Sequence, residues 1–127
     1  MTKIAVAGLG KMGLQVAKKL HEGGFSVIAH NRSAGPIEEM KKRGITPAYT
    51  KDEVLKVFGN CKVIIWLMIP YEAVDNELEE WLKLVPKNSI FIDGGNSDFR
   101  LTQKRSQMVK KFGSVLMDVG TSGGVWG

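Results

Sequence analysis

The sequence is poor in cysteine and has no long apolar run. Its one cysteine, Cys61, cannot form a disulfide within the chain or complete a C-x-x-C metal pair, which favours a reducing, cytoplasmic environment. Because Cys61 precedes an apolar run, we expect it to pack in the core rather than to act as a reactive thiol. No apolar run approaches the roughly 20 residues of a membrane helix, and the N-terminus enters a short apolar segment directly. Neither a membrane span nor a signal peptide is expected.

Positive charge is only moderately in excess, with 18 lysines and arginines against 13 acidic residues. The basic clusters at residues 41–43, 104–105 and 110–111 alternate with apolar positions, which is typical of solvated helix faces. Aromatic residues do not alternate with basic ones, so no nucleic-acid partner is expected. With 43% hydrophobic and 24% charged residues, residues 1–127 are expected to form one globular domain. A positive field would still attract a phosphorylated cofactor or an acidic substrate.

The first 30 residues contain a glycine fingerprint in its required context. An apolar run at 4–7 is followed by G-x-G-x-x-G at 8–13, and an apolar helical stripe is expected at Met12, Val16, Ala17 and Leu20. A second apolar run follows at 25–29. A strand, a glycine turn, a helix and a second strand within about 30 residues predict a dinucleotide-binding unit.

Each glycine of the fingerprint has a physical task. Gly8 allows a tight turn out of the strand, Gly10 leaves room for a pyrophosphate to approach the backbone, and Gly13 lets the helix lie close to the strand. The helix that begins near Gly10 would direct unpaired N–H groups and about half a positive charge at the phosphates. The alternative is an ordinary glycine-rich turn that binds no ligand.

The end of the second strand predicts which cofactor is bound. An acidic residue at this position usually holds the ribose 2′-hydroxyl of NAD, whereas an arginine accommodates the 2′-phosphate of NADP. This chain has Asn31, Arg32 and Ser33 there, and its next carboxylate is Glu38. The guanidinium of Arg32 can bind a phosphate and stack on adenine. We therefore predict NADP, with NAD as the alternative cofactor; Arg32 as a merely solvated loop residue is the competing interpretation.

The rest of the chain continues the alternation of strands and helices. We expect an edge strand at 45–49, because Pro47 cannot lie in a central strand, and further strands at 62–68, 89–92 and 115–119. Helices are expected at 36–43, 50–58, 70–85 and 97–112. The T-x-x-E spacing of Thr50 and Glu53 predicts a capping box at the start of the second helix. The last helix is expected to have a buried face formed by Leu101, Met108, Val109 and Phe112. The pattern predicts an α/β fold: a Rossmann-type, doubly wound parallel sheet in the order 3-2-1-4-5-6.

Polar or glycine-rich loops follow the carboxyl ends of these strands. They include 8–13, 31–33, 68–70, 93–97 and 120–124. In an open α/β sheet those ends share one edge, where ligands bind. Two glycine-rich loops beyond the first indicate close approach of the backbone to something else at this edge. Asn96 and Ser122 add side-chain donors, which suit a polyhydroxylated or carboxylate substrate.

With these loops identified, the chain resembles the N-terminal coenzyme domain of decarboxylating 6-phosphogluconate dehydrogenases along essentially its whole length. GLGKMG and HNRS are typical of the wider β-hydroxyacid dehydrogenase group, which includes 3-hydroxyisobutyrate dehydrogenases. IDGGNS at 92–97 and DVGTSGGVWG at 118–127 are the specific motifs, and the GVWG ending resembles the shorter bacterial form.

The resemblance implies a set of binding residues, which divides into cofactor and substrate contacts. The cofactor contacts would be Gly8, Leu9, Gly10, Lys11, Met12, Gly13, Asn31, Arg32, Ser33, Met68, Ile69, Pro70 and Asn96. The substrate contacts would be Asn96, Ser122, Gly123 and Gly124. No metal is implied. The alternative for residues 68–70 is simple packing.

The family's reaction, as the resemblance implies it, oxidises and decarboxylates 6-phosphogluconate to ribulose 5-phosphate in the pentose phosphate pathway and in gluconate utilisation. The family's catalytic lysine and glutamate lie beyond the final glycine loop, so no catalytic residue is assigned in this chain. The candidate bases in and around the fingerprint are not expected to replace them; these are Lys11, Lys18, Lys19, His21 and His30. We expect a fragment without the family's all-helical C-terminal domain, inactive alone.

Two other functions remain open from the sequence. One is a hydroxyacid dehydrogenase of the 3-hydroxyisobutyrate type, which acts on a smaller substrate; the DGGNS motif argues against it. The other is a stand-alone NADP-binding module that senses redox state. The resemblance further implies at least a homodimer for the full-length enzyme.

Overall fold

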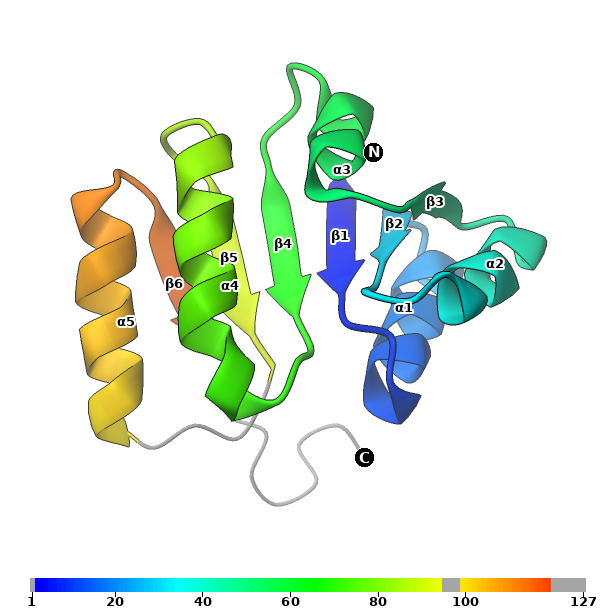
Figure 1. Cartoon of the computed structure of the whole chain (residues 1–127). Helices are drawn as coiled ribbons and strands as arrows, with labels where there is room; N and C mark the ends of the chain where they lie inside the picture. Colours follow the sequence, from blue (N-terminus) through cyan, green and yellow to red (C-terminus); the bar gives the residue numbers. More distant parts are fainter. Residues whose placement is uncertain (1, 95–98, 120–127) are drawn as a thin grey trace.

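The computed structural model describes residues 2–94 and 99–119, in which strands and helices alternate throughout (Figure 1). In order, the elements are β1 (Lys3–Ala7), α1 (Lys11–Glu22), β2 (Ser26–His30), α2 (Ala34–Lys42), β3 (Thr46–Ala48), α3 (Lys51–Phe58), β4 (Ile64–Leu67), α4 (Tyr71–Leu84), β5 (Ile90–Asp93), α5 (Phe99–Lys111) and β6 (Val115–Asp118). Each strand–helix unit predicted from the sequence is present, with ends that differ by a few residues.

The strands form one six-stranded sheet in the order β3-β2-β1-β4-β5-β6, and every neighbouring pair is parallel. The predicted Rossmann-type order is therefore confirmed. β3 lies at one edge, where Pro47 pairs in register with Ala29 of β2. β1 and β4 are the two central strands, and the strand order reverses between them. Ligands of open α/β sheets bind at such a reversal.

Helices cover both faces of the sheet (Figure 1). On one face, Ala17 of α1 and Ile37 and Met40 of α2 pack against the side chains of β1 and β2. The opposite face is covered by α3, α4 and α5, with Phe58, Trp81 and other large side chains fully buried. Burial on both faces explains why β1 and β4 are continuous apolar runs rather than alternating ones.

The helix starts are encoded locally. At α3, Thr50 Oγ1 accepts a hydrogen bond from the Glu53 N–H at 3.1 Å, and Glu53 Oε2 accepts one from the Thr50 N–H at 3.1 Å. This is the capping box predicted from the T-x-x-E spacing. α4 begins directly after Pro70, whose fixed φ suits the start of a helix.

Several packing expectations are wrong. Cys61 is exposed, because it lies in a turn closed by its N–H and the Phe58 carbonyl, before β4 begins. Phe112 is 50% exposed, because α5 ends at Lys111 and the chain turns at Gly113, where φ is +84°. Met12 is 51% exposed and does not join the apolar stripe of α1. No helix in the described ranges is both long and apolar enough to cross a bilayer.

The turn from β1 into α1 packs so closely against the end of β4 that two of its positions have no room for a side chain. A Cβ atom on Gly8, whose φ is +102°, would lie 2.3 Å from the Met68 carbonyl oxygen. A Cβ on Gly13 would lie 1.9 Å from the Gly8 carbonyl oxygen. Both contacts are with backbone, which cannot move aside as a flexible side chain does. The first turn of α1 therefore depends on these two glycines for its position.

This packing predicts a large difference between two glycine-to-alanine variants. We expect Gly13→Ala to lower the free energy of unfolding by about 3 kcal/mol, because the methyl group overlaps the Gly8 carbonyl. Gly35→Ala is the control, since no described atom lies within 4 Å of its Cβ position in α2. It should leave stability unchanged or raise it by up to about 1 kcal/mol. Urea unfolding measures both; equal stabilities would contradict the packing argument.

Candidate functional site

The carboxyl ends of β1, β2 and β4 bring three of the predicted loops together at one edge of the sheet. Hydrogen bonds join them directly: the Gly8 N–H donates to the His30 carbonyl at 2.9 Å, and the Met68 N–H donates to the Ala7 carbonyl at 2.8 Å. The loops are thus extensions of the sheet ladder rather than independent segments. Their relative positions follow from the strand order.

Asn31 connects the fingerprint to the end of β2. Its Oδ1 accepts a hydrogen bond from the Leu9 N–H at 2.9 Å, and its Nδ2 donates to the Ser33 carbonyl and hydroxyl oxygens at 3.2 and 3.1 Å. The amide therefore holds two loops in register. Its contacts within the protein use both ends of the side chain, so Asn31 organises the site as well as bordering it.

The start of α1 is open. A Cβ on Gly10 would have no described atom within 4 Å, in contrast to the crowded positions at Gly8 and Gly13. Gly10 is the N-cap of α1, no side chain caps this helix start, and its first turn contains no acidic residue. Unpaired N–H groups at a helix N-terminus, free of nearby carboxylates on that turn, are the usual binding site for a phosphate.

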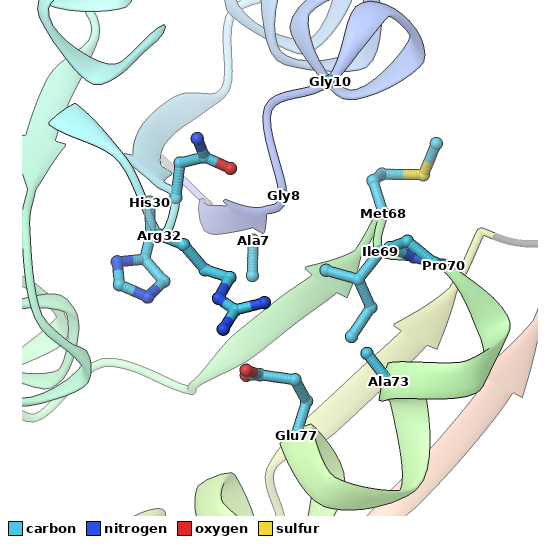
Figure 2. Close-up of a pocket in the computed structure, with 11 residues that line it drawn as sticks. Ala7, Gly8, Gly10, His30, Arg32, Met68, Ile69, Pro70, Ala73 and Glu77 are labelled. Carbon is cyan, nitrogen blue, oxygen red and sulfur yellow. The ribbon is translucent and has the colours of Figure 1, made fainter. Parts of the chain in front are cut away.

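A pocket of about 230 Å³ lies beside this helix start (Figure 2). We call it the fingerprint pocket; it is lined by Ala7, Gly8, Gly10, His30, Asn31, Arg32, Met68, Ile69, Pro70, Ala73 and Glu77. Its walls combine backbone of the glycine turn, apolar side chains from the end of β4 and the start of α4, and the guanidinium of Arg32. An apolar slot bordered by a few polar groups is typical of a nucleotide-binding pocket.

A second, more open hollow of about 500 Å³ continues from the fingerprint pocket past Arg32. We call it the outer hollow. It shares Arg32 and Glu77 with the fingerprint pocket and adds polar groups from α3 and α4, including Lys51 and Glu80. Arg32 is exposed and points into the space between β2 and α4 (Figure 2). Its guanidinium can therefore contact a group in either space.

His30 forms part of the wall of both spaces but is held by the protein. Its Nδ1 donates to the Ala48 carbonyl at 3.0 Å, and its ring meets Trp81 edge-to-face with centroids 5.9 Å apart. Burial lowers the pKa of His30 below its ordinary value of 6.5, and the positive charge of Lys51 acts in the same direction. The ring is thus a neutral, anchored wall of the pocket.

The loop after β5 begins at a buried ion pair. Asp93, 1% exposed, ends β5, and Arg105 of α5, 3% exposed, places Nη1 3.8 Å from Asp93 Oδ2 while its Nε donates to Asp75 Oδ1 at 2.7 Å. At the next residue, Gly94, packing within the protein favours glycine independently of any ligand. Its Cβ would lie 2.3 Å from Met68 Sδ and 2.5 Å from Trp66 Nε1.

The structure brings together seven of the predicted cofactor contacts: Gly8, Gly10, Asn31, Arg32, Met68, Ile69 and Pro70. Four others, Lys11, Met12, Gly13 and Ser33, border the same loops without lining the pocket, and the Leu9 side chain is buried in the core. Asn96, Ser122, Gly123 and Gly124 lie outside the described residues.

Sequence reasoning missed four residues of the pocket: Ala7 and His30 at the ends of β1 and β2, and Ala73 and Glu77 on α4. Ala73 and Glu77 follow Pro70 by three and seven residues, and therefore lie on one face of α4. Helical spacing from Pro70 could have identified Ala73 and Glu77.

A family model described as the NAD binding domain of 6-phosphogluconate dehydrogenase matches residues 3–127.

Two curated relatives show how much of the chain is shared. A protein named putative 6-phosphogluconate dehydrogenase YqeC, from Bacillus subtilis (strain 168), is 30% identical over 125 residues, which are 98% of this chain and 42% of that protein. An NADP(+)-dependent, decarboxylating 6-phosphogluconate dehydrogenase of the same organism is 30% identical over 126 residues, which are 96% of this chain and 27% of that protein. The chain spans less than half the length of either relative.

Among solved structures, a 3-hydroxyisobutyrate dehydrogenase from Mycobacterium tuberculosis matches with a TM-score of 0.80 and 19% identity, over 93% of this chain and 40% of that one. An imine reductase from Bacillus cereus matches with the same score, identity and coverage. At this identity the likeness establishes the shared fold alone.

The anchored histidine predicts a pH dependence of stability. Because burial lowers the pKa of His30 in the folded chain, the neutral ring contributes its full stability above about pH 6.5. This stability is lost as the pH falls through the folded pKa, because the unfolded chain binds a proton at this histidine before the folded chain does. We expect His30→Asn, whose amide can still donate to Ala48, to show a smaller fall in Tm between about pH 7 and pH 5. His21→Asn, at an exposed position, is the control. Identical pH profiles for the two variants would contradict the assignment.

Proposed function

The chain belongs to the family of NAD-binding domains of 6-phosphogluconate dehydrogenases, and from this premise we propose that it binds NADP and forms the coenzyme domain of a decarboxylating dehydrogenase. The observation that carries the proposal is the meeting of the open helix start at Gly10 with Arg32 in one pocket. Membership of the family supports a nicotinamide cofactor; the choice of NADP and of the substrate is our proposal.

The described residues fit a dinucleotide. The pyrophosphate would bind the N–H groups at the start of α1, where the absence of a Cβ on Gly10 leaves the backbone accessible. Lys11 is exposed on the same turn and adds a positive charge beside the phosphates. The adenine would occupy the apolar wall formed by Ile69, Pro70 and Ala73. Gly8 and Gly13 act indirectly, by setting the position of the turn.

Arg32 supports NADP over NAD. It is exposed, and among the described residues no carboxylate lies within ion-pair distance of it, so its guanidinium is available for a phosphate. The Ser33 hydroxyl lies beside it, oriented by Asn31. One relative is named as NADP(+)-dependent, which agrees with the proposal.

When bound, the nicotinamide would supply the hydride acceptor for oxidation of an alcohol. The part played by the described residues is to bind and orient the cofactor at the carboxyl edge of the sheet. His30, the histidine of the pocket, is held by Ala48 and Trp81 as part of the pocket wall, and we propose no catalytic role for it. We propose that the proton transfers are made by residues of the full-length enzyme outside this chain.

We propose 6-phosphogluconate as the substrate of the full-length enzyme, on the basis of the IDGGNS motif and the family match. A substrate panel on the full-length protein tests this, with 6-phosphogluconate, 3-hydroxyisobutyrate and gluconate compared at equal concentration. We expect the highest kcat/KM with 6-phosphogluconate, accompanied by release of CO2. A higher kcat/KM with 3-hydroxyisobutyrate, without CO2, would support the smaller-substrate dehydrogenase instead.

The role of Arg32 is testable by calorimetric titration with NADP and NAD. We expect Arg32→Ala to weaken NADP binding about 10- to 100-fold, because a charge-assisted contact with the 2′-phosphate is lost, while NAD binding changes less than about threefold. Arg43→Ala is the matched control, since Arg43 is an exposed arginine at the C-terminus of α2 and does not line the pocket. Unchanged NADP affinity in the Arg32 variant would refute the cofactor assignment.

A further inference from the structure

Glu77 places a negative charge on the pocket wall that faces Arg32. It lies on α4 one turn after Ala73, and it lines both the fingerprint pocket and the outer hollow. Figure 2 shows its carboxylate and the Arg32 guanidinium pointing toward one another from opposite sides. Within the described part of the chain no ion pair joins the two groups. A ligand group on the guanidinium therefore also faces a carboxylate.

The outer hollow contains a second cation, but it is already paired. Lys51 Nζ lies 3.1 Å from Glu77 Oε2 and 3.7 Å from Glu80 Oε1, and it is 5.5 Å from the centroid of the Trp81 ring. These contacts hold the ammonium on the α4 side of the hollow. Arg32 and Lys51 are thus balanced by Glu77 and Glu80, and the four formal charges around the hollow sum to zero. An arginine alone would have left the hollow positive.

We propose that Glu77 is a specificity-determining residue that reduces the preference of this chain for a 2′-phosphorylated dinucleotide over its 2′-hydroxyl counterpart. The proposal rests on the proposed function, since it requires the pocket to bind an adenine dinucleotide. A 2′-phosphate carries about two negative charges and is repelled by the carboxylate. A 2′-hydroxyl is neutral and can donate a hydrogen bond to it. The same side chain therefore acts in opposite directions on the two cofactors.

Glu77 carries this effect rather than Glu80. The Glu77 side chain is 21% exposed and borders both spaces, whereas the Glu80 side chain is 59% exposed and borders the outer hollow alone. Solvent and salt screen an exposed charge more strongly than a half-buried one. The distance of Glu80 from Lys51 is also longer, so its charge is less firmly placed.

The experiment measures the Kd of NADP and of NAD by calorimetry for the full 127-residue chain and two variants. We expect Glu77→Gln, which keeps the shape of the side chain, to raise NADP affinity about fivefold and to leave NAD affinity equal or lower. The ratio of the two affinities is the decisive readout, because a general loss of structure would weaken both cofactors together. Tm is recorded for each variant to measure the loss of the Lys51 ion pair separately.

Glu79→Gln is the matched control. It removes the same charge from the same helix, at an exposed position that lines neither the fingerprint pocket nor the outer hollow. A Glu77→Gln ratio that is unchanged, or changed no more than in the Glu79 variant, overturns the proposal while leaving cofactor binding intact. If the unaltered chain binds neither NADP nor NAD, the proposed function fails, and the specificity proposal fails with it.

Discussion

The site depends on how closely the turn after β1 approaches the end of β4. Two backbone contacts set that approach: Gly8 against the Met68 carbonyl, and Gly13 against the Gly8 carbonyl. The hydrogen bond from the Met68 N–H to the Ala7 carbonyl continues the same contact into the sheet. Because core packing fixes all three, the helix start at Gly10 is held in place before any ligand arrives. Such preorganisation reduces the entropy that binding must overcome.

Much of this arrangement could be predicted from local sequence. The strand order followed from the alternation of apolar runs and helical stripes, and the T-x-x-E spacing at Thr50 located the start of α3. Local patterns failed where an element ends within an apolar stretch. Cys61 and Phe112 each lie just outside a strand or helix, so the apolar stretch around them did not predict burial.

Residues from distant segments were harder to predict. Glu77 is 45 positions after Arg32 in the chain, and the two side chains face one another because Arg32 follows β2 and α4 begins after β4, at the same edge of the sheet (Figure 2). No short motif contains both residues. Sequence reasoning therefore identified the arginine that favours a phosphate but not the carboxylate opposite it. Local motifs describe which ligand a loop can bind, whereas the balance of charges around the ligand depends on the packing of separate elements.

Because two of the three fingerprint glycines are crowded by backbone, their presence in a distant relative does not by itself indicate nucleotide binding. A homologue that had abandoned nucleotide binding would still need Gly8 and Gly13, because the core itself requires them. Of the three fingerprint glycines, only Gly10 faces open space among the described atoms, so substitution at that position would be the early sign that a ligand had been lost. In this fold, Gly8 and Gly13 can therefore be retained for packing after nucleotide binding has been lost.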